Sequence, residues 1–284
     1  MAQRSVAPHQ QVRTFRQTVR LRAVPSAFKA WFTGSSPIYI DYGYTMTNSD
    51  SMVVASREAR RSYRSPQREA RARATSRRVL GAATALFTEY GYAGTTVRAV
   101  AAKAEVSVPT VEALFGTKAR LLKAAIDVAI AGDDEPVAML DRHWAREATE
   151  ATDVETLLSI VASVLAPAQD RSSGLVLSVF EGAKSDSELA RVATQMTAQR
   201  AIMAAWIVDR LVALGSLRGE ISEDEAVDTL FALMEPALFD RLIHRRGWTH
   251  DRYELWMARS LLHLLASDVG RRFQSSTNTE RSPA

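Results

Sequence analysis

A short run of small and polar side chains around position 110 has the composition expected of a helix that reads DNA. Ser107 is a good N-cap, and Pro109 fits the first turn of a helix, where its missing N–H costs nothing. Val111 and Phe115 are spaced to face inward. The outward residues are then Val108, Pro109, Thr110, Glu112 and Ala113. A helix whose N-terminal, outward side chains are small or polar suits insertion into the major groove, which is about 12 Å wide.

Residues suited to catalysis or metal binding are scarce by comparison. The chain has no cysteine, and its five histidines share no recognised ligand spacing. The acidic run Asp133-Asp134-Glu135 stands beside a helix start, where carboxylates usually offset the helix dipole. No nucleophile elbow, phosphate-binding loop or dinucleotide fingerprint occurs. The sequence predicts no enzyme, no metal site and no cofactor.

Two short helices joined by a tight turn are predicted to position the outward side chains. Thr96 can cap a first helix with one apolar stripe, and Glu105 and Val106 can form the turn. The stripe consists of Val97, Val100, Ala101 and Ala104. The pattern predicts a helix-turn-helix over residues 96–115. The alternative is an ordinary helical hairpin inside a core.

The flanking segments extend this pair to a small domain. Ser65 and Pro66 can begin a helix that runs to Tyr90, with Gly91 as a left-handed C-cap. Thr117 can cap a further helix that ends near Gly132. The inward residues are Val79, Ala82, Ala83, Leu86 and Phe87 before the pair, and Leu121, Leu122, Ala125 and Val128 after it.

Residues 77–122 resemble the DNA-binding domain of tetracycline-repressor (TetR) family regulators. Features that match lie in one order over about fifty residues, consistent with a single domain of this size. They are Ala82-Ala83, Leu86-Phe87, Gly91-Tyr92, Thr95-Thr96, Val106-Ser107, Thr110-Val111, Phe115, Lys118 and Leu121. Two positions depart from the family pattern, because Glu112 replaces a usual tyrosine and Leu114 a usual histidine or tyrosine. Both family residues normally touch the DNA backbone.

The resemblance and the helix spacing together assign a set of DNA-contacting residues. They are Thr95, Thr96, Arg98, Ser107, Val108, Pro109, Thr110, Glu112 and Lys118. Lys118 is expected to share a phosphate with the N-terminal amides of its own helix. For Glu112 three roles are open: it accepts from a cytosine amino group, it is held off the DNA by Lys118 or Arg120, or it simply repels phosphate.

Charge is distributed unevenly along the chain. Residues 1–78 carry a net charge of +11 and residues 79–284 a net charge of −7. The arginines nearest the helix-turn-helix, expected to neutralise phosphates, are Arg68, Arg71, Arg73 and Arg77. The chain is 46% hydrophobic and 24% charged, and no run reaches the roughly eighteen apolar residues of a membrane span. The lack of cysteine fits a reducing cytoplasm.

The chain divides into five predicted segments. Residues 1–56 form a basic, disordered extension, either a true arm or a product of start-site choice at Met46 or Met52. An Arg-rich arm over 57–72 leads into the DNA-binding domain over 73–132. Residues 133–268 form a C-terminal helical domain, and 269–284 a disordered tail.

The C-terminal domain is predicted to be helical throughout. Capping boxes at Thr152/Glu155, Ser185/Glu188 and Ser222/Glu225 each open an apolar-periodic run. The last two helices are expected from Glu223 to about Arg246, kinked at Pro236, and from Asp251 to about Ser267.

The resemblance implies a small-molecule pocket and a dimer interface in this domain. Pocket candidates are Phe180, Met203, Trp206, Met234 and Trp256. Interface candidates are Leu230, Met234, Leu255, Ala258, Leu262 and Leu265. In each case the alternative is burial in the core of one chain.

The expected fold is all-α: a three-helix DNA-binding domain with a helix-turn-helix, followed by a ligand-binding and dimerisation bundle. The expected function is transcriptional regulation by a ligand-responsive repressor, a homodimer that binds a palindromic operator on double-stranded DNA and responds to a small-molecule effector. The alternative is a small-molecule-binding helical dimer with a degenerate DNA reader.

Overall fold

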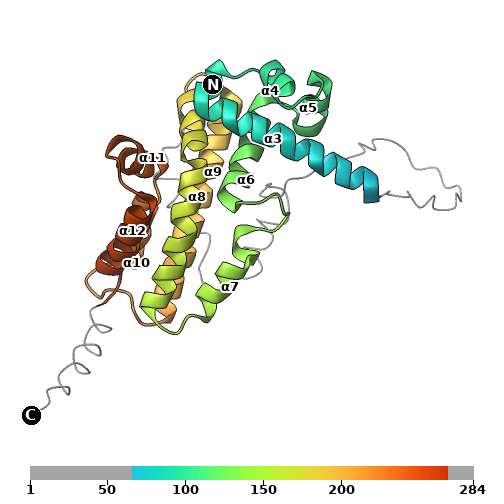
Figure 1. The fold of residues 1–284 in the computed structure, drawn as a ribbon. Helices are drawn as coiled ribbons and strands as arrows, with labels where there is room; N and C mark the ends of the chain where they lie inside the picture. Colours follow the sequence, from blue (N-terminus) through green and yellow to red (C-terminus); the bar gives the residue numbers. More distant parts are fainter. Residues whose placement is uncertain (1–65, 268–284) are drawn as a thin grey trace, which may run out of the picture. The chain divides into compact units, whose positions relative to one another are not determined.

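The computed structural model describes residues 66–267, and this part of the chain consists of helices and their connections (Figure 1). Its one β-type contact is an isolated antiparallel bridge between Leu217 and Ala266. The predicted all-α fold class is confirmed. The basic extension over 1–56, the first part of the Arg-rich arm and the tail over 269–284 lie outside the described residues, as does the side chain of Arg68.

Four helices form the N-terminal part. They are α3 (Pro66–Gly94), α4 (Val97–Lys103), α5 (Val108–Phe115) and α6 (Lys118–Ala131). Regular helix in α3 is interrupted at Gly91, whose φ of 66° and ψ of −176° turn the chain towards α4. Gly132, with φ of 87°, ends α6 in the left-handed conformation expected of a C-cap.

The C-terminal part is organised around one long helix. Its elements are η2 (Met139–Asp141), α7 (His143–Glu150), α8 (Val154–Gly182), α9 (Ser187–Ala213), α10 (Glu223–Leu233), α11 (Pro236–Asp240), η3 (Arg241–Arg245) and α12 (His250–Leu265). α8 contacts α3 and α6 towards one end and α7, α9, α11 and α12 elsewhere. It therefore connects helices α3 and α6 with the rest of the described chain (Figure 1).

Of the three capping boxes predicted in the C-terminal domain, one has the predicted N-cap residue. Ser222 caps α10 by accepting from the backbone N–H of Glu225 at 3.2 Å. α8 and α9 begin one residue later than expected, because Asp153 and Asp186 act as the N-caps in place of Thr152 and Ser185. An aspartate offers a charged acceptor to the N-terminal amides of a helix, which stabilises it further through the helix dipole.

The predicted kink at Pro236 is a complete break. α10 ends at Leu233, and Pro236 occupies the first turn of α11, where it needs no hydrogen-bond partner. The chain continues through the π-helix η3 and starts α12 at His250, capped by Thr249. The prediction of one helix over 223–246 is therefore wrong.

Two hydrophobic clusters hold the structure together. The N-terminal core combines α3 to α6 with Leu175, Val176 and Val179 of α8 and Leu189 of α9. The C-terminal core combines the other half of α8 with α9, α10, α11 and α12. The N-terminal core thus extends across the predicted domain boundary at Gly132, and the DNA-binding helices are packed directly on α8 and α9.

Candidate nucleic-acid interface

The predicted reader helix α5 begins with two interlocked hydroxyl groups. The Ser107 Oγ accepts from the backbone N–H of Thr110 at 3.2 Å and lies 2.8 Å from the Thr110 Oγ1. Val111 is 1% exposed and fixes the helix against the core. Pro109, Glu112 and Ala113 are exposed, and Val108 and Thr110 are half-buried. Three of the five residues expected on the outside are thus exposed, whereas Val108 packs partly against the N-terminal core.

The helix before it, α4, is held at both ends. The Thr96 Oγ1 accepts from the backbone N–H of Ala99 at 3.1 Å, as an N-cap does. At the turn Glu105 adopts a φ of 55°, which is uncommon for a residue with a side chain, and the Val106 N–H donates to the Ala101 carbonyl at 3.0 Å. These contacts confirm the predicted helix-turn-helix over residues 96–115.

Thr95 differs from the expectation. It is 1% exposed, and its hydroxyl lies 3.0 Å from the Leu86 carbonyl and 2.8 Å from the Gly91 carbonyl. A side chain that is buried and bonded to the end of α3 cannot reach DNA. We therefore correct the assignment of Thr95: it fastens α4 to α3.

Lys118 is also engaged inside the chain. Its Nζ donates to the carbonyl oxygens of Tyr92 at 2.9 Å and Thr95 at 3.1 Å, and it lies 3.9 Å from the centroid of the Tyr92 ring. Burial lowers the pKa of this ammonium from its ordinary value, opposed by the charge of Asp186. Two of the three donors of this ammonium are used by these carbonyl groups, and the ammonium also lies over the Tyr92 ring, so most of its bonding capacity is spent inside the chain.

Several arginines of α3 and α4 are exposed. Arg98 on α4 and Arg71, Arg73 and Arg78 on α3 are all exposed. The Arg77 Nη1 lies 3.7 Å from the Asp134 Oδ2, and the Arg77 side chain is still 61% exposed. Arginine side chains on this surface are suited to neutralise phosphates, as the charge distribution predicts.

Glu112 lies on the exposed face of α5, and the structure excludes one of its three proposed roles, that of being held off the DNA by Lys118 or Arg120. Neither proposed neighbour restrains it, because Lys118 binds carbonyl groups and the Arg120 Nε lies 3.6 Å from the Glu188 Oε1. The Glu112 side chain is thus exposed and not bound by either neighbour. Base reading and phosphate repulsion are the two roles that stay open.

Replacing Glu112 by alanine is expected to strengthen binding to every DNA sequence about three- to tenfold, because a carboxylate near phosphates is repelled. Base preference is expected to stay unchanged. Binding-site selection with wild type and Glu112→Ala measures both quantities. Loss of a cytosine preference at one position, worth about 1–3 kcal/mol, would instead assign Glu112 to base reading.

A cavity of about 650 Å³ lies between the C-terminal end of α6, the segment after it, α7 and α8. Its lining residues are Ile130, Ala131, Glu135, Val137, Met139, Asp141, Arg142, His143, Trp144, Arg146, Ser163, Val164, Pro167 and Arg171. Pro167 has no N–H, so the Ser163 carbonyl in the same wall lacks its helical donor. The walls therefore combine apolar side chains with several polar groups.

Two arginines of the cavity connect it to the helices around it. The Arg171 Nε donates to the Ala129 carbonyl at 2.7 Å and its Nη2 to the Ile130 carbonyl at 3.2 Å, so α8 closes the C-terminal end of α6. Arg142 donates to both carboxylate oxygens of Asp133, at 2.6 and 2.9 Å. The Arg142 hydrogen bond is the main cause that lowers the pKa of Asp133.

The predicted pocket residues do not line this cavity. Phe180 packs against the N-terminal core, and Met203, Trp206, Met234 and Trp256 pack against the C-terminal core. Trp206 comes nearest, because its ring meets the ring of Trp144 edge on at 5.6 Å between centroids. The cavity residues gave no signal in the sequence, since they come from four separate segments.

The predicted interface residues divide into two groups. Leu230 and Leu265 are 0% exposed and belong to the core of the chain itself, so they are not available to a partner. Leu255 is 51% exposed, and Ala258 and Leu262 share its face of α12 at helical spacing. Met234 lies half-buried at the end of α10.

Within residues 66–267, no cluster of three or more metal-binding side chains occurs. The helices of this same range include none that is long and apolar enough to cross a bilayer.

Comparison with known proteins identifies the DNA-binding part. Residues 79–125 match the family model described as bacterial regulatory proteins, tetR family. The match covers the second half of α3, all of α4 and α5, and the first half of α6. No curated protein sequence matches this chain.

Solved structures share the fold at low sequence identity. SmeT of Stenotrophomonas maltophilia, in complex with triclosan, is 17% identical with a TM-score of 0.53, over 69% of this chain and 93% of that one. The fatty acid degradation regulator FadR from Bacillus halodurans is 17% identical with a TM-score of 0.52, over 66% and 94%. A protein assigned as a transcriptional regulator from Saccharomonospora viridis, in complex with choline, is 17% identical with a TM-score of 0.53, over 69% and 99%.

The helix-turn-helix with its two side-chain caps, the exposed arginines beside it and the family match over the same residues agree with one another. Regulators of this family bind DNA and are not enzymes. The chain therefore carries a DNA-binding domain of the tetR family of bacterial regulatory proteins, over residues 79–125.

Proposed function

We propose that this protein acts in the cytoplasm as a homodimeric repressor that releases a palindromic operator when a small molecule binds. The observation that carries the proposal is the second apolar stripe of α12. Tyr253, Met257 and Leu261 form the stripe that is buried in the chain, and Leu255 and Leu262 belong to another. The chain covers this second stripe only in part, because Leu262 packs partly against the C-terminal core whereas Leu255 is 51% exposed.

A two-fold dimer through this stripe presents two copies of α5 to the DNA. Each copy enters the major groove of one half-site, and the half-sites lie about 34 Å apart or somewhat more. The operator repeats the two-fold symmetry of the protein. Phosphate contacts from Arg98, Arg71 and Arg73 add affinity that depends on salt but not on sequence.

The cavity beside α6 is where we place the effector. Its volume of about 650 Å³ suits a small organic molecule, and its walls combine apolar and polar groups. Arg171 lines the cavity and also closes the end of α6, whose other end follows the reader. A ligand that draws the Arg171 guanidinium away from Ala129 therefore favours a second position of α6, and of the reader with it.

Proteins of similar fold form complexes with triclosan and with choline, which supports a small-molecule effector for this chain. Those ligands have different chemistry, and they belong to those proteins. The effector of this chain is set by its own lining residues, which include the charged side chains of Arg146, Arg171, Glu135 and Asp141.

A gel-shift assay of the full chain with the DNA upstream of its own gene tests the proposal. We expect one retarded complex with a protein-to-DNA ratio of two. Its affinity is expected to fall about 10³-fold between 50 and 200 mM salt, as it does for a protein that contacts about six phosphates. Ligands of the cavity can be found by screening small molecules for those that release the DNA from the protein. A protein-to-DNA ratio of one would contradict the dimeric repressor. Ligand binding without DNA binding would favour the alternative, a small-molecule-binding dimer whose helix-turn-helix no longer reads DNA.

A further inference from the structure

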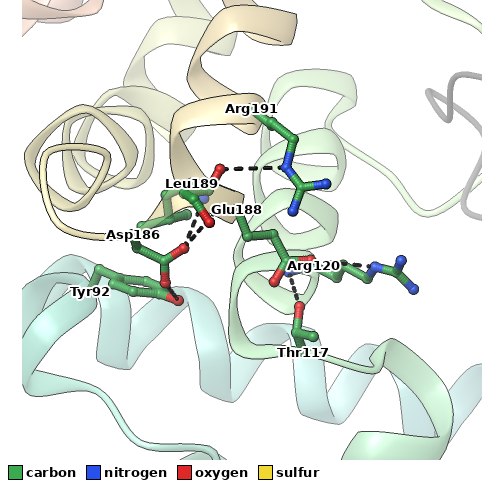
Figure 2. A network of polar contacts seen from close by, with 8 residues as sticks. Tyr92, Thr117, Arg120, Asp186, Glu188, Leu189 and Arg191 are labelled. Carbon is green, nitrogen blue, oxygen red and sulfur yellow. Dashed lines mark hydrogen bonds and ion pairs between the residues drawn. The ribbon is translucent and has the colours of Figure 1, made fainter. Parts of the chain in front are cut away.

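Tyr92 connects the DNA-binding helices to the corner between α8 and α9. The Tyr92 hydroxyl donates to the Asp186 Oδ2 at 2.9 Å across 94 residues of sequence (Figure 2). The other oxygen of the same carboxylate, Oδ1, accepts from the backbone N–H groups of Glu188 at 2.8 Å and Leu189 at 3.1 Å. One side chain thus caps α9 and holds the end of α3.

The corner is shaped to receive the Tyr92 ring. Gly182 ends α8 there, and a Cβ at that position would lie 3.2 Å from the Tyr92 Cδ1 and 2.4 Å from the Leu189 Cδ1. Leu189 is 0% exposed, so it cannot move aside easily. The ring of Tyr92 is also stacked near Phe87, with centroids 6.2 Å apart. Tyr92 is therefore fixed by contacts from α3, α8 and α9.

Lys118 completes the arrangement at the start of α6. Its ammonium lies over the Tyr92 ring and binds the carbonyl oxygens of Tyr92 and Thr95, one residue before the N-cap of α4. A second and weaker tie joins the same elements, because the Arg120 Nε lies 3.6 Å from the Glu188 Oε1 and the Arg120 side chain is 73% exposed (Figure 2). The first residues of α4 and of α6 are thus held to one point on the C-terminal domain.

We propose that Tyr92, Asp186 and Lys118 form a clamp that fixes the orientation of the reader on the C-terminal domain, with Lys118 as a positioning residue that makes no phosphate contact. The inference rests on the proposed dimer, since the orientation of each reader then sets the distance between the two. A clamped reader accepts one half-site spacing. One added base pair moves a half-site by about 3.4 Å and rotates it about the DNA axis.

The clamp can be opened without removing the residues that fold the corner. Tyr92→Phe keeps the ring and its contact with Lys118 but deletes the bond to Asp186. Asp186→Asn keeps an oxygen for the N-cap of α9 but presents an uncharged amide to the Tyr92 hydroxyl, which replaces a charge-assisted bond by a weaker one. Tyr90→Phe is the matched control, because Tyr90 is 55% exposed on the same helix and does not bond to α9.

The test measures affinity for the operator and for versions with one base pair added or removed between the half-sites. Wild type and Tyr90→Phe are expected to lose about tenfold or more on the altered spacings. Tyr92→Phe and Asp186→Asn are expected to bind the native operator about three- to tenfold more weakly, but to lose little more on the altered ones. A merely structural role would lower affinity for all spacings equally, and that result would overturn the clamp.

Lys118→Met supplies a second measurement that does not depend on the dimer. A phosphate contact would make the salt dependence of binding shallower by about one unit, whereas a positioning role leaves the slope unchanged. Arg98→Met, which removes an exposed charge on α4, is the control expected to reduce the slope. A reduced slope in Lys118→Met would overturn its positioning role. Wild-type protein that binds no operator would overturn the proposed function and the clamp together, whereas unchanged variants with a binding wild type would overturn the clamp alone.

Discussion

Replacing Arg71, Arg73 and Arg78 together by glutamine is expected to weaken DNA binding about a hundredfold at 0.1 M salt and to reduce the salt slope by about two to three units. All three side chains are exposed on α3, whose first turns extend beyond the helix-turn-helix in Figure 1. Glutamine is nearly as good a helix former as arginine, so α3 is expected to stay intact. Affinity measured at several salt concentrations gives both quantities.

The matched control carries the same change in net charge elsewhere. Arg241, Arg245 and Arg246 are exposed at η3, away from the reader in the sequence and in the fold. Their replacement by glutamine is expected to leave the salt slope within about half a unit of wild type. Equal effects of the two triple variants would mean that net charge alone, without α3 contacts, attracts the DNA.

The parts of the interface that depend on local sequence could be predicted. Thr96, Ser107 and Thr117 each precede a helix and accept from the amide three residues later, a contact that the sequence specifies by itself. Gly91 and Gly132 have the positive φ angles expected where a helix must end. Local patterns of this kind are independent of the rest of the fold.

The parts that depend on contacts between distant segments could not be predicted. Thr95 looks like its exposed neighbour Thr96, and only the position of the α3 carbonyl groups shows that it is buried. The bond between Tyr92 and Asp186 joins two residues with no shared motif. The contacts of Lys118 could not be predicted either, because its partners are backbone carbonyl groups, which every residue has.

In the C-terminal domain, the exposed fraction of each side chain distinguishes leucines that the sequence pattern alone does not. Leu230, Leu255 and Leu265 are indistinguishable in a periodic pattern, yet Leu230 and Leu265 are 0% exposed and Leu255 is 51% exposed. The pattern predicts that the helices have more than one apolar side. Which side faces a partner follows only from the packing of α10 and α12 on α8 and α9.

Replacing Leu255 by glutamate is expected to raise the dissociation constant of the dimer about a hundredfold or more, because two-fold symmetry places the change in the interface twice. The folded chain itself is expected to keep its thermal stability, since Leu255 is already half-exposed within one protomer. Sedimentation measures the dimer, and a thermal melt measures the fold. Operator binding is expected to fall with dimer formation, because a single reader contacts only one half-site.

Leu264→Glu is the matched control on the same helix. Leu264 is 45% exposed, similar to Leu255, but it stands outside the stripe that Leu255 shares with Ala258 and Leu262. A dimer that survives Leu264→Glu and dissociates in Leu255→Glu places the interface on that stripe. Dissociation by both variants would extend it to the end of α12. A stable Leu255→Glu dimer would move the interface to another face, and the distance between the two readers would then follow from that face instead.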